Sequence, residues 1–372
     1  MDFLKRCWAE IDLEAVRYNY EQYRKLVPEN IPVMCVVKAA CYGHDDRLIV
    51  PFLQNELGVR YFAVSNLDEA VRLRELGITG EILILGYTPP EYADILSEQN
   101  LLQACTEADY ARRLSSIAKG TVRLHIAVDT GMTRIGLHDS ADNCAREIAE
   151  IARLENISAE GIFTHYSSAD GITPEDEEYT KAQTEKFLAV RDKARALGVK
   201  LEQAHILNSA GGAYGYCDES TLARLGIILY GLYPDPAKAL PFKPKPVMKL
   251  KAVVSQVKEI SAGESVSYGR TFTADKPMKL ATVTAGYADG YPRKLSNIGE
   301  VVINNTKCPI RGRICMDQFM CDVTDAGAVR PGDVAELMNE EINADVIAAL
   351  TGTIGYEVTC VVTSRVPRIA VK

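Results

Sequence analysis

The sequence lacks the features that mark several large classes of protein. It contains no basic block, and its net charge is −8, so a nucleic-acid-binding surface is not expected. Its longest apolar stretches, 82–86 and 222–231, are much shorter than the roughly 20 residues that a membrane span needs. The first six residues do not resemble a signal peptide. We therefore expect a globular protein of the cytoplasm.

Evidence for metal or disulfide chemistry is also scarce. None of the ten cysteines belongs to a Cys-x-x-Cys pair, and several, such as Cys35 and Cys105, lie within apolar runs. This usage is typical of buried thiols in a reducing compartment. The five histidines, at positions 44, 125, 138, 165 and 205, include no close pair along the chain. No metal site is predicted.

The order of candidate elements up to Pro241 predicts a barrel. Short β-branched runs alternate there with amphipathic stretches, which is the pattern of an α/β fold of the TIM type, the closed (β/α)8 barrel. The candidate strands are 33–37, 61–64, 81–85, 101–105, 122–128, 159–164, 203–207 and 223–229, and the candidate helices are 13–26, 67–76, 108–117, 141–154 and 179–197. An open doubly wound sheet would show the same alternation, but the first turn has no Gly-x-Gly-x-x-Gly motif to support it.

After Pro241 the pattern changes to that of a mostly β domain. Pro241, Pro244 and Pro246 mark a linker-like stretch, and glycine-containing turns separate the short runs that follow. The candidate strands are 248–259, 279–285, 299–303, 306–313, 318–323, 333–337 and 358–362, and 342–350 is predicted to be a helix. We expect two domains, a barrel of residues 1–240 and a β-rich domain of residues 241–372, with the first residues of the chain pairing with the second domain.

A lysine occupies the place where barrel chemistry is expected. Lys38 directly follows the candidate strand 33–37 and is followed closely by Tyr42 and Gly43. Active sites of such barrels lie at the C-terminal ends of the strands. Burial there would lower the pKa of a lysine and free its amine to form a Schiff base. For a lone lysine, a side chain that reaches solvent at the rim would be the simpler interpretation.

The segment around this lysine resembles the bacterial alanine racemase family, enzymes that use pyridoxal 5′-phosphate (PLP) on a barrel followed by a β-domain. The family signature reads Val-Val-Lys-Ala-Asn-Ala-Tyr-Gly-His-Gly, and residues 36–45 depart from it only at Ala40, Cys41 and Asp45. Further blocks match in order along nearly the whole chain, at 8–13, 128–136, 161–166, 208–210, 224–227, 266–269, 286–290, 313–318, 356–357 and 364–368. The resemblance implies an isomerase that interconverts L- and D-alanine and supplies D-alanine for the peptidoglycan of the cell wall.

The resemblance also implies a two-base mechanism. Racemisation needs a proton removed from one face of Cα and returned to the other, so a second base is required beside Lys38, which binds the PLP aldehyde. Tyr268 matches the second base of the family. A phenol is a weak base at neutral pH unless its phenolate is stabilised, and the family achieves this through a histidine and an arginine that correspond to His165 and Arg224. Arg224 also donates to the pyridine nitrogen of PLP.

The remaining site residues follow from the same resemblance. The PLP-binding residues are Lys38, Tyr42, Ser209, Arg224, Gly226, Ile227 and Tyr356. The residues that face the substrate are Arg134, Met316 and Asp317, of which Arg134 is also assigned to catalysis. The residues along the channel through which substrate enters are Asp170, Tyr287, Arg293 and Arg313. In the family Tyr268, Met316 and Asp317 reach the site from the other subunit, so a homodimer with shared active sites is implied.

One departure from the family concerns the surroundings of Arg134. Many relatives carry a carbamylated lysine two residues before the Asp-Thr-Gly-Met block, and this lysine orients the arginine. The corresponding residue here is Ala127. Arg134 therefore needs another anchor, such as a chloride ion, a water molecule or a different side chain.

Several alternatives keep part of this chemistry. One alternative is a serine or serine/alanine racemase domain of a vancomycin-resistance protein, which would belong to the cytoplasmic part of a larger membrane protein. Tyr356 favours alanine over serine as the substrate, because its phenol fills the space that the hydroxymethyl group of serine would need. A PLP decarboxylase of the same barrel type is disfavoured by Arg224, since such enzymes usually place an acid against the pyridine nitrogen. A non-catalytic PLP-binding protein would lack the β-domain. A Schiff-base aldolase without PLP would lack the aldimine absorbance of the purified protein.

Overall fold

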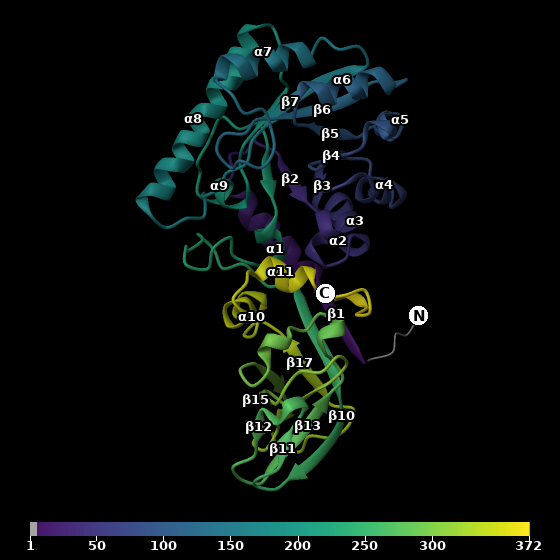
Figure 1. Cartoon of the computed structure of the whole chain (residues 1–372), viewed down its shortest axis with the longest axis vertical. Coiled ribbons are helices and arrows are strands. Elements are labelled where there is room, and N and C mark those ends of the chain that lie inside the picture. Colours follow the sequence, from purple (N-terminus) through teal and green to yellow (C-terminus); the bar gives the residue numbers. More distant parts are fainter. Residues whose placement is uncertain (1–5, 372) are drawn as a thin grey trace.

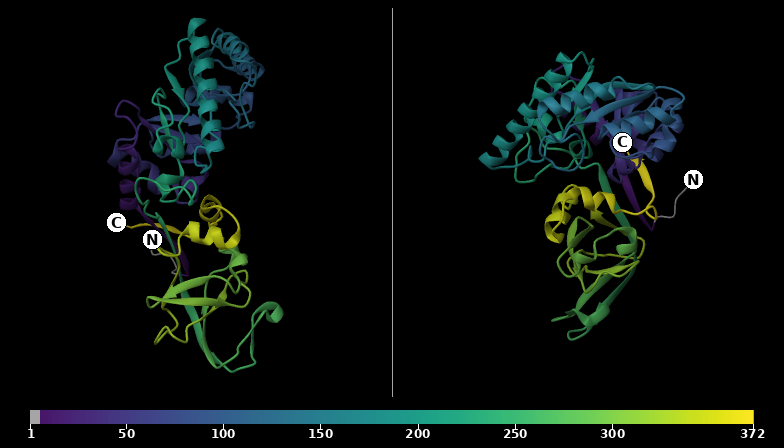
Figure 2. Two further views of the ribbon diagram at one scale, coloured as in Figure 1. Left: turned by 90° about the vertical axis from the view of Figure 1, so that its left-hand side faces the viewer. Right: turned by 45° about the horizontal axis from the view of Figure 1, so that its top comes forward.

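The computed structural model describes residues 6–371, which form two lobes joined near the middle of the molecule (Figures 1 and 2). The upper lobe combines a parallel sheet with helices on its outside, and the lower lobe consists mainly of antiparallel strands. The long strand β10 (Met248–Ile260) extends from the junction into the lower lobe. Among residues 6–371, every helix is too short or too polar to cross a membrane.

A parallel barrel forms the first lobe. Its eight strands follow one another in the order β8-β7-β6-β5-β4-β3-β2-β9, and a parallel bridge between Leu207 and Ala223 brings the two ends of this order together. The strands are β2 (Val33–Val36), β3 (Tyr61–Val64), β4 (Glu81–Ile84), β5 (Leu102–Cys105), β6 (Val122–Ala127), β7 (Ile157–Phe163), β8 (Gln203–His205) and β9 (Ala223–Leu225). The predicted α/β barrel is confirmed.

Helices cover the outside of the barrel, as Figure 1 shows. These helices are α1 (Leu13–Arg24), α3 (Asp46–Leu57), α4 (Leu67–Glu75), α5 (Ala93–Glu98), α6 (Ala108–Ile117), α7 (Ala141–Ile151) and α8 (Pro174–Ala196). The short helical segments of this lobe lie in the connections that follow strands and are α2 (Lys38–Tyr42), η1 (Pro90–Tyr92), α9 (Ser209–Ala213) and η2 (Ile227–Tyr230). The side chains of Asp12, Asn66 and Ser140 accept hydrogen bonds from backbone N–H groups at the starts of α1, α4 and α7. Such caps satisfy groups that the first helical turn leaves unpaired.

Two barrel elements differ from their predicted bounds. The strand predicted at 223–229 ends at Leu225, and its second half forms η2 with all four residues buried; a continuous apolar run does not distinguish a strand from a buried helical turn. The helix predicted at 179–197 begins at Pro174. Thr173 and Asp176 form a capping box there, which starts the helix ahead of its apolar residues.

The second lobe is built around a mostly antiparallel sheet in the order β13-β16-β15-β14-β17-β10-β1-β18, with β13 also paired to β10. Its strands besides β10 are β1 (Cys7–Asp12), β13 (Met278–Val283), β14 (Glu300–Ile303), β15 (Thr306–Arg311), β16 (Phe319–Asp322), β17 (Val334–Met338) and β18 (Arg368–Val371). The remaining elements are the two-stranded β11 (Ser265–Val266) and β12 (Phe272–Thr273), the helices α10 (Ala344–Thr351) and α11 (Gly355–Cys360), and the short turns η3 (Tyr268–Arg270), η4 (Tyr287–Asp289) and η5 (Arg293–Leu295). Strand β1 pairs antiparallel with β10 and parallel with β18. The domain boundary between residues 240 and 241 stays a prediction.

The strand predicted at 358–362 is wrong, because this segment belongs to helix α11 and its end. Its β-branched residues favour a strand, but the buried residues Gly355, Val358 and Thr359 are spaced as on one face of a helix, and burial outweighs intrinsic preference.

A close backbone contact joins helix α11 to the barrel. Gly43 has φ +85°, and a β-carbon there would overlap the carbonyl of Thr359. The second lobe thereby reaches the turn that carries Lys38.

Candidate active site

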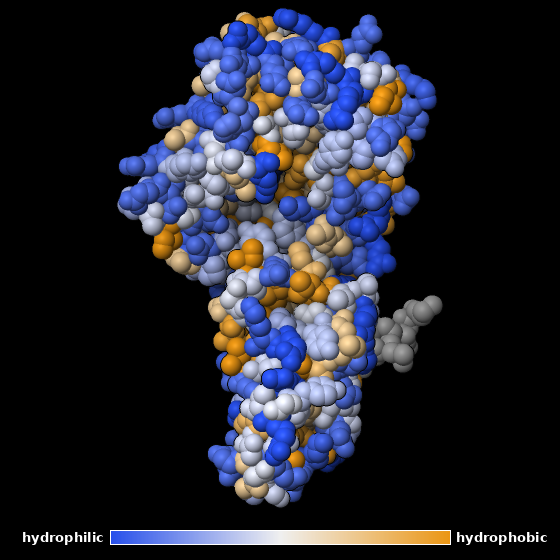
Figure 3. Space-filling model, viewed as in Figure 1, coloured by the Kyte–Doolittle hydropathy of each residue, from blue (hydrophilic) through white to orange (hydrophobic). Residues whose placement is uncertain are grey.

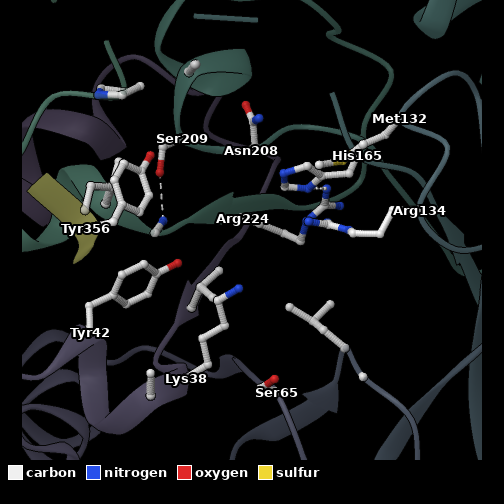
Figure 4. Close-up of a pocket in the computed structure, with 18 of the residues that line it drawn as sticks. Lys38, Tyr42, Ser65, Met132, Arg134, His165, Asn208, Ser209, Arg224 and Tyr356 are labelled. Carbon is white, nitrogen blue, oxygen red and sulfur yellow. Dashed lines mark hydrogen bonds between the residues drawn. The ribbon is translucent and has the colours of Figure 1, made fainter. Parts of the chain in front are cut away.

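A cavity of about 1090 Å³ opens at the C-terminal ends of the barrel strands. Ten of the predicted site residues line it: Lys38, Tyr42, Arg134, His165, Asp170, Ser209, Arg224, Gly226, Ile227 and Tyr356. Figure 4 shows the amine of Lys38 pointing into the space between two groups of side chains. The hydroxyls of Tyr42, Ser209 and Tyr356 lie on one side, and the nitrogens of Arg224, His165 and Arg134 lie on the other.

Lys38 begins an unusual turn directly after β2. Ala39, Ala40, Cys41 and Tyr42 have φ values of 52°, 49°, 57° and 54°, so four residues with β-carbons adopt the left-handed conformation, which costs roughly 1–2 kcal/mol for each residue. A carboxylate supports the turn from outside. Glu69 on α4 accepts a hydrogen bond from the backbone N–H of Ala39 at 2.8 Å, and its other oxygen accepts one from Ser65 at 2.7 Å. This turn sends Lys38 and Tyr42 into the same cavity.

The surroundings of Lys38 favour its neutral amine. Burial lowers the pKa of Lys38, and the nearby positive charge of Arg134 lowers it further, while Glu69 acts in the opposite direction. A lowered pKa leaves a larger share of the amine unprotonated at neutral pH. Lys38 is therefore able to act as a nucleophile or a base in this cavity.

A small polar cradle lies on one side of this amine. The hydroxyl of Ser209 accepts a hydrogen bond from the backbone N–H of Gly226 at 2.8 Å. A β-carbon at residue 226 would lie 3.0 Å from the hydroxyl of Tyr42 and 3.6 Å from that of Ser209, so the glycine leaves this space open. Burial raises the pKa of both Tyr42 and Tyr356, and their hydroxyls remain proton donors. Hydroxyl and backbone N–H groups in an open space suit an anionic group such as a phosphate.

Arg224 lies buried on the other side, in the middle of the short strand β9. Its Nη1 donates to His205 Nδ1 at 2.6 Å and to the His205 carbonyl at 3.0 Å. Its Nη2 donates to the carbonyls of Thr164 and Ile206 and lies 3.4 Å from His165 Nδ1. All of these acceptors are uncharged. Burial lowers the pKa of Arg224 to about 10, which still leaves it a cation at neutral pH.

His165 lies close to that cation and stays neutral. Burial lowers its pKa to about 3, and the positive charges of Arg224, Arg134 and Lys38 act in the same direction. Arg134 has no side-chain hydrogen bond or ion pair within residues 6–371, and Ala127 offers no polar side-chain atom to it. The expected anchors for Arg134 were a chloride ion, a water molecule or another side chain. Within residues 6–371, no side chain makes the direct contact with the Arg134 guanidinium that such an anchor would make.

The other predicted residues lie apart from the cavity, on the second lobe. They are Tyr268, Tyr287, Arg293, Arg313, Met316 and Asp317, and we call them the second-lobe cluster. Several of them are neighbours. The hydroxyl of Ser267 donates to the carbonyl of Arg313 at 2.6 Å, a β-carbon on Gly269 would lie 3.2 Å from the Arg313 guanidinium, and the backbone N–H of Ala288 donates to the carbonyl of Met316 at 3.0 Å. Tyr268 is 70% exposed and Met316 52% exposed.

Sequence reasoning did not assign several residues that line the cavity. Among them are Ser65, Met132, Asn208, Glu357 and Cys360. Asn208 and Met132 stand inside the matched blocks, so their neighbourhood was recognisable, whereas Ser65 follows β3 and could have been suggested only by its place at a strand end. Cys360 differs from the expected buried thiols because it is exposed. Within residues 6–371 no three potential metal-ligating side chains come together.

The chain is similar to known proteins over nearly its whole length. The family described as "Alanine racemase, N-terminal domain" matches residues 11–234, and that described as "Alanine racemase, C-terminal domain" matches residues 247–370. Alanine racemase 1 of Clostridium acetobutylicum is 41% identical, covering 99% of this chain and 96% of its own. An alanine racemase of Desulfovibrio desulfuricans is 40% identical and covers both chains completely.

A solved structure agrees with these relatives. The alanine racemase of Clostridium difficile 630 in complex with cycloserine has a TM-score of 0.90 and 33% identity, covering 99% of this chain and 96% of that one. These matches include both lobes, the cavity and the second-lobe cluster in a single alignment. The chain belongs to the alanine racemase family.

Proposed function

We propose that this protein interconverts L- and D-alanine with PLP as its cofactor, and that two copies of the chain share each active site. The observation that carries the proposal is the half-buried amine of Lys38, which lies between the hydroxyl cradle and the buried guanidinium of Arg224. The names of the relatives favour alanine over serine as substrate. All ten cysteines are free, which fits a reducing compartment such as the cytoplasm.

The cavity fits PLP by the chemistry of its groups. Lys38 would hold the aldehyde carbon, and the phosphate would lie against a set made of Tyr42, Ser209, Gly226, Ile227 and Tyr356. The space that Gly226 leaves beside two hydroxyls suits a dianion. Arg224 would donate to the ring nitrogen. When bound, PLP supplies an electron sink for the negative charge that develops at Cα.

The residues of this chain supply the proton chemistry. Lys38 Nζ, whose pKa burial lowers, takes or returns the proton on one face of Cα. Tyr268 from a second copy serves the other face. The side chains of His165 and Arg224 are 3.4 Å apart. His165 would connect the phenol of that tyrosine to the Arg224 cation by hydrogen bonds, and Arg134 would help to orient the tyrosine.

Arg224 also restrains the reaction. Burial lowers the pKa of its guanidinium only to about 10, so at neutral pH it keeps its own proton and offers a hydrogen bond without transferring a charge. With PLP bound, Arg224 would donate to the ring nitrogen without protonating it, and the cofactor would then draw less negative charge away from Cα. This arrangement favours return of the proton to Cα over side reactions such as transamination, and it disfavours the decarboxylase alternative.

The exposure of the second-lobe cluster supports the shared site. Tyr268 and Met316 carry large apolar surfaces into solvent, and exposed hydrophobic side chains near a functional cluster are typical of an interface. Figure 3 shows hydrophobic residues around the hollow between the two lobes. A second copy that placed its cluster over this hollow would complete the site and bury these side chains. Asp317 and the residues of the substrate channel, Asp170, Tyr287, Arg293 and Arg313, would then lie around one opening.

The experiment that tests the proposal compares L-alanine and L-serine under saturating PLP, with D-isomer formation followed by chiral separation. We expect a higher kcat/KM for alanine. A higher value for serine would support the serine racemase alternative. Retention of the Cα proton in deuterated water, with PLP bound, would instead support a non-catalytic PLP-binding protein.

A further inference from the structure

The loop of residues 129–138 carries Arg134 and is held together by one carboxylate. Asp129 Oδ1 accepts hydrogen bonds from two backbone N–H groups of the loop, at 2.9 and 3.0 Å. At the base of the loop, Leu137 donates its backbone N–H to the carbonyl of Ala127 at 2.9 Å, and Asp129 donates to the carbonyl of Leu137 at 3.0 Å. The loop is therefore a compact unit, and its position depends on what it docks against.

The amide of Gln183 provides this docking from helix α8. Gln183 is fully buried, and its Nε2 donates to the hydroxyl of Thr130 and to the carbonyl of His165, each at 3.1 Å. Its Oε1 accepts from the backbone N–H and the hydroxyl of Ser167, at 3.0 and 3.1 Å. An amide has two N–H donors and two acceptor lone pairs, and here all four are used. One side chain thus joins the loop of Arg134 to the segment of His165.

The same helix makes a second contact with the loop. One turn earlier, the hydroxyl of Tyr179 donates to the carbonyl of Gly131 at 2.8 Å. The hydroxyls of Thr130 and Thr164 are also 2.8 Å apart, so the loops after β6 and β7 contact each other directly beside Gln183. Docking through the backbone can fix the place of Arg134 even though residue 127 supplies no side-chain anchor.

We propose that Gln183 is a positioning residue, which sets the placement of Arg134 relative to His165 from outside the cavity and takes over the part that an anchoring side chain at position 127 would play. The proposal rests on the roles of Arg134 and His165 in the proposed function. Gln183 itself does not line the cavity. It acts through the two loops that it joins.

The test uses an isosteric substitution and a matched control on the same helix. Gln183→Glu keeps an oxygen acceptor for Ser167 but loses both donors, those to Thr130 and the His165 carbonyl. Thr184→Val, at the next residue, removes a partly buried hydrogen bond of 2.6 Å with the hydroxyl of Tyr166 and one of 3.0 Å to the carbonyl of Thr180. It touches neither Thr130 nor loop 129–138. Any general effect of removing a hydrogen bond from α8 is shared by both variants.

The first readout is amide hydrogen exchange of peptides that cover residues 129–138, measured by mass spectrometry on the holoenzyme. We expect faster exchange in Gln183→Glu and wild-type exchange in Thr184→Val, because only the former releases the loop. Unchanged exchange in Gln183→Glu would overturn the proposal. If the wild-type protein does not racemise alanine, the proposed function fails, and this measurement still decides whether Gln183 docks the loop.

The second readout separates positioning from a merely structural role. For Gln183→Glu we expect kcat to fall roughly 10- to 100-fold, the scale of a small misplacement near the reacting atoms, with KM nearly unchanged. The ratio of variant to wild-type kcat should rise as the pH is lowered, because the buried carboxyl becomes protonated and regains one donor. A wild-type kcat in a variant whose loop exchanges faster would contradict the proposal. Should this variant fail to fold, Tyr179→Phe removes only the contact with Gly131 and should accelerate exchange in the same peptides.

Discussion

The cavity of the barrel and the second-lobe cluster differ in how they hold their polar groups. In the cavity, Arg224 and Ser209 are buried and hydrogen-bonded within the chain. In the second-lobe cluster, Tyr268 extends into solvent, and the carboxylate of Asp317 accepts a hydrogen bond from Arg365 at 2.8 Å. A single chain therefore builds the cofactor half of the proposed site completely and leaves the other half facing outward. The proposed function explains this difference by a second copy that brings the halves together.

Removing the amine of Lys38 should abolish the function of the cavity. We expect Lys38→Ala to lose both racemisation and covalent attachment of PLP, because Lys38 is the only lysine among residues 6–371 that lines the cavity. Borohydride reduction of the wild-type protein, followed by peptide mapping, should place the pyridoxyl group on Lys38. Lys119→Ala, at an exposed lysine remote from the cavity, is the control. A label on any other lysine would show that the assignment of the attachment site is wrong.

Removing one hydroxyl from the second-lobe cluster should leave the cavity intact but impair the reaction. We expect Tyr268→Phe to bind PLP like the wild-type protein and to lose about 10²–10⁴-fold in rate, the usual effect of losing a positioned acid or base. In this family the tyrosine serves the L-isomer, so exchange of the Cα proton of L-alanine should suffer most. Tyr92→Phe, on an exposed tyrosine of the barrel, controls for loss of a phenol. Wild-type exchange of both isomers in Tyr268→Phe would contradict the two-base mechanism.

The two lobes should also respond differently to acid, since the buried histidines all belong to the barrel. Burial lowers the pKa of His44 and His125 to about 4 and that of His165 to about 3, against an ordinary value of 6.5. Below pH 6.5 the unfolded chain binds more protons than the folded one. The contribution of these histidines to the free energy of unfolding is therefore fully present above pH 6.5. It is lost as the pH falls toward about 4, by about 1.4 kcal/mol per pH unit for each histidine.

Urea unfolding between pH 7 and pH 4.5 measures this loss. The only tryptophan, Trp8, is buried in β1 of the second-lobe sheet, so its fluorescence follows the second lobe, while far-UV circular dichroism is dominated by the helices of the barrel. In His125→Gln, the free energy of unfolding should depend less steeply on pH, because one proton fewer is bound on unfolding. An unchanged pH dependence in this variant would mean that His125 is not held neutral in the folded state.

Much of the fold followed from local patterns in the sequence. The barrel strands are buried on both faces, as in β2 and β5, so they read as short apolar runs separated by helices. The parallel order then follows from the alternation itself. Helix α11 could not be predicted in this way. Its residues favour strands locally, and its helical form depends on packing against the turn at Gly43, a contact between residues more than 300 positions apart.

The site divides in the same way. The matched motifs place Lys38, Arg224 and Ser209 within a barrel strand or in the segment that follows one, and the barrel brings these positions together at one opening. The left-handed turn after Lys38 and its support by Glu69 were not foreseen, since no local preference of Ala39 or Ala40 predicts a positive φ. Gln183 lies in the middle of a helix whose pattern says nothing of the two loops that it joins.

The central claim is that each active site combines the cavity of one chain with the second-lobe cluster of another. It is tested most directly by mixing the Lys38→Ala and Tyr268→Phe proteins, each nearly inactive alone, under conditions in which subunits exchange, with two affinity tags to isolate the mixed dimers. A mixed dimer contains one site with both Lys38 and Tyr268, so a randomly mixed sample should regain about a quarter of the wild-type activity. Mixed dimers that are isolated in good yield and show no activity beyond the sum of the two variants would contradict the claim.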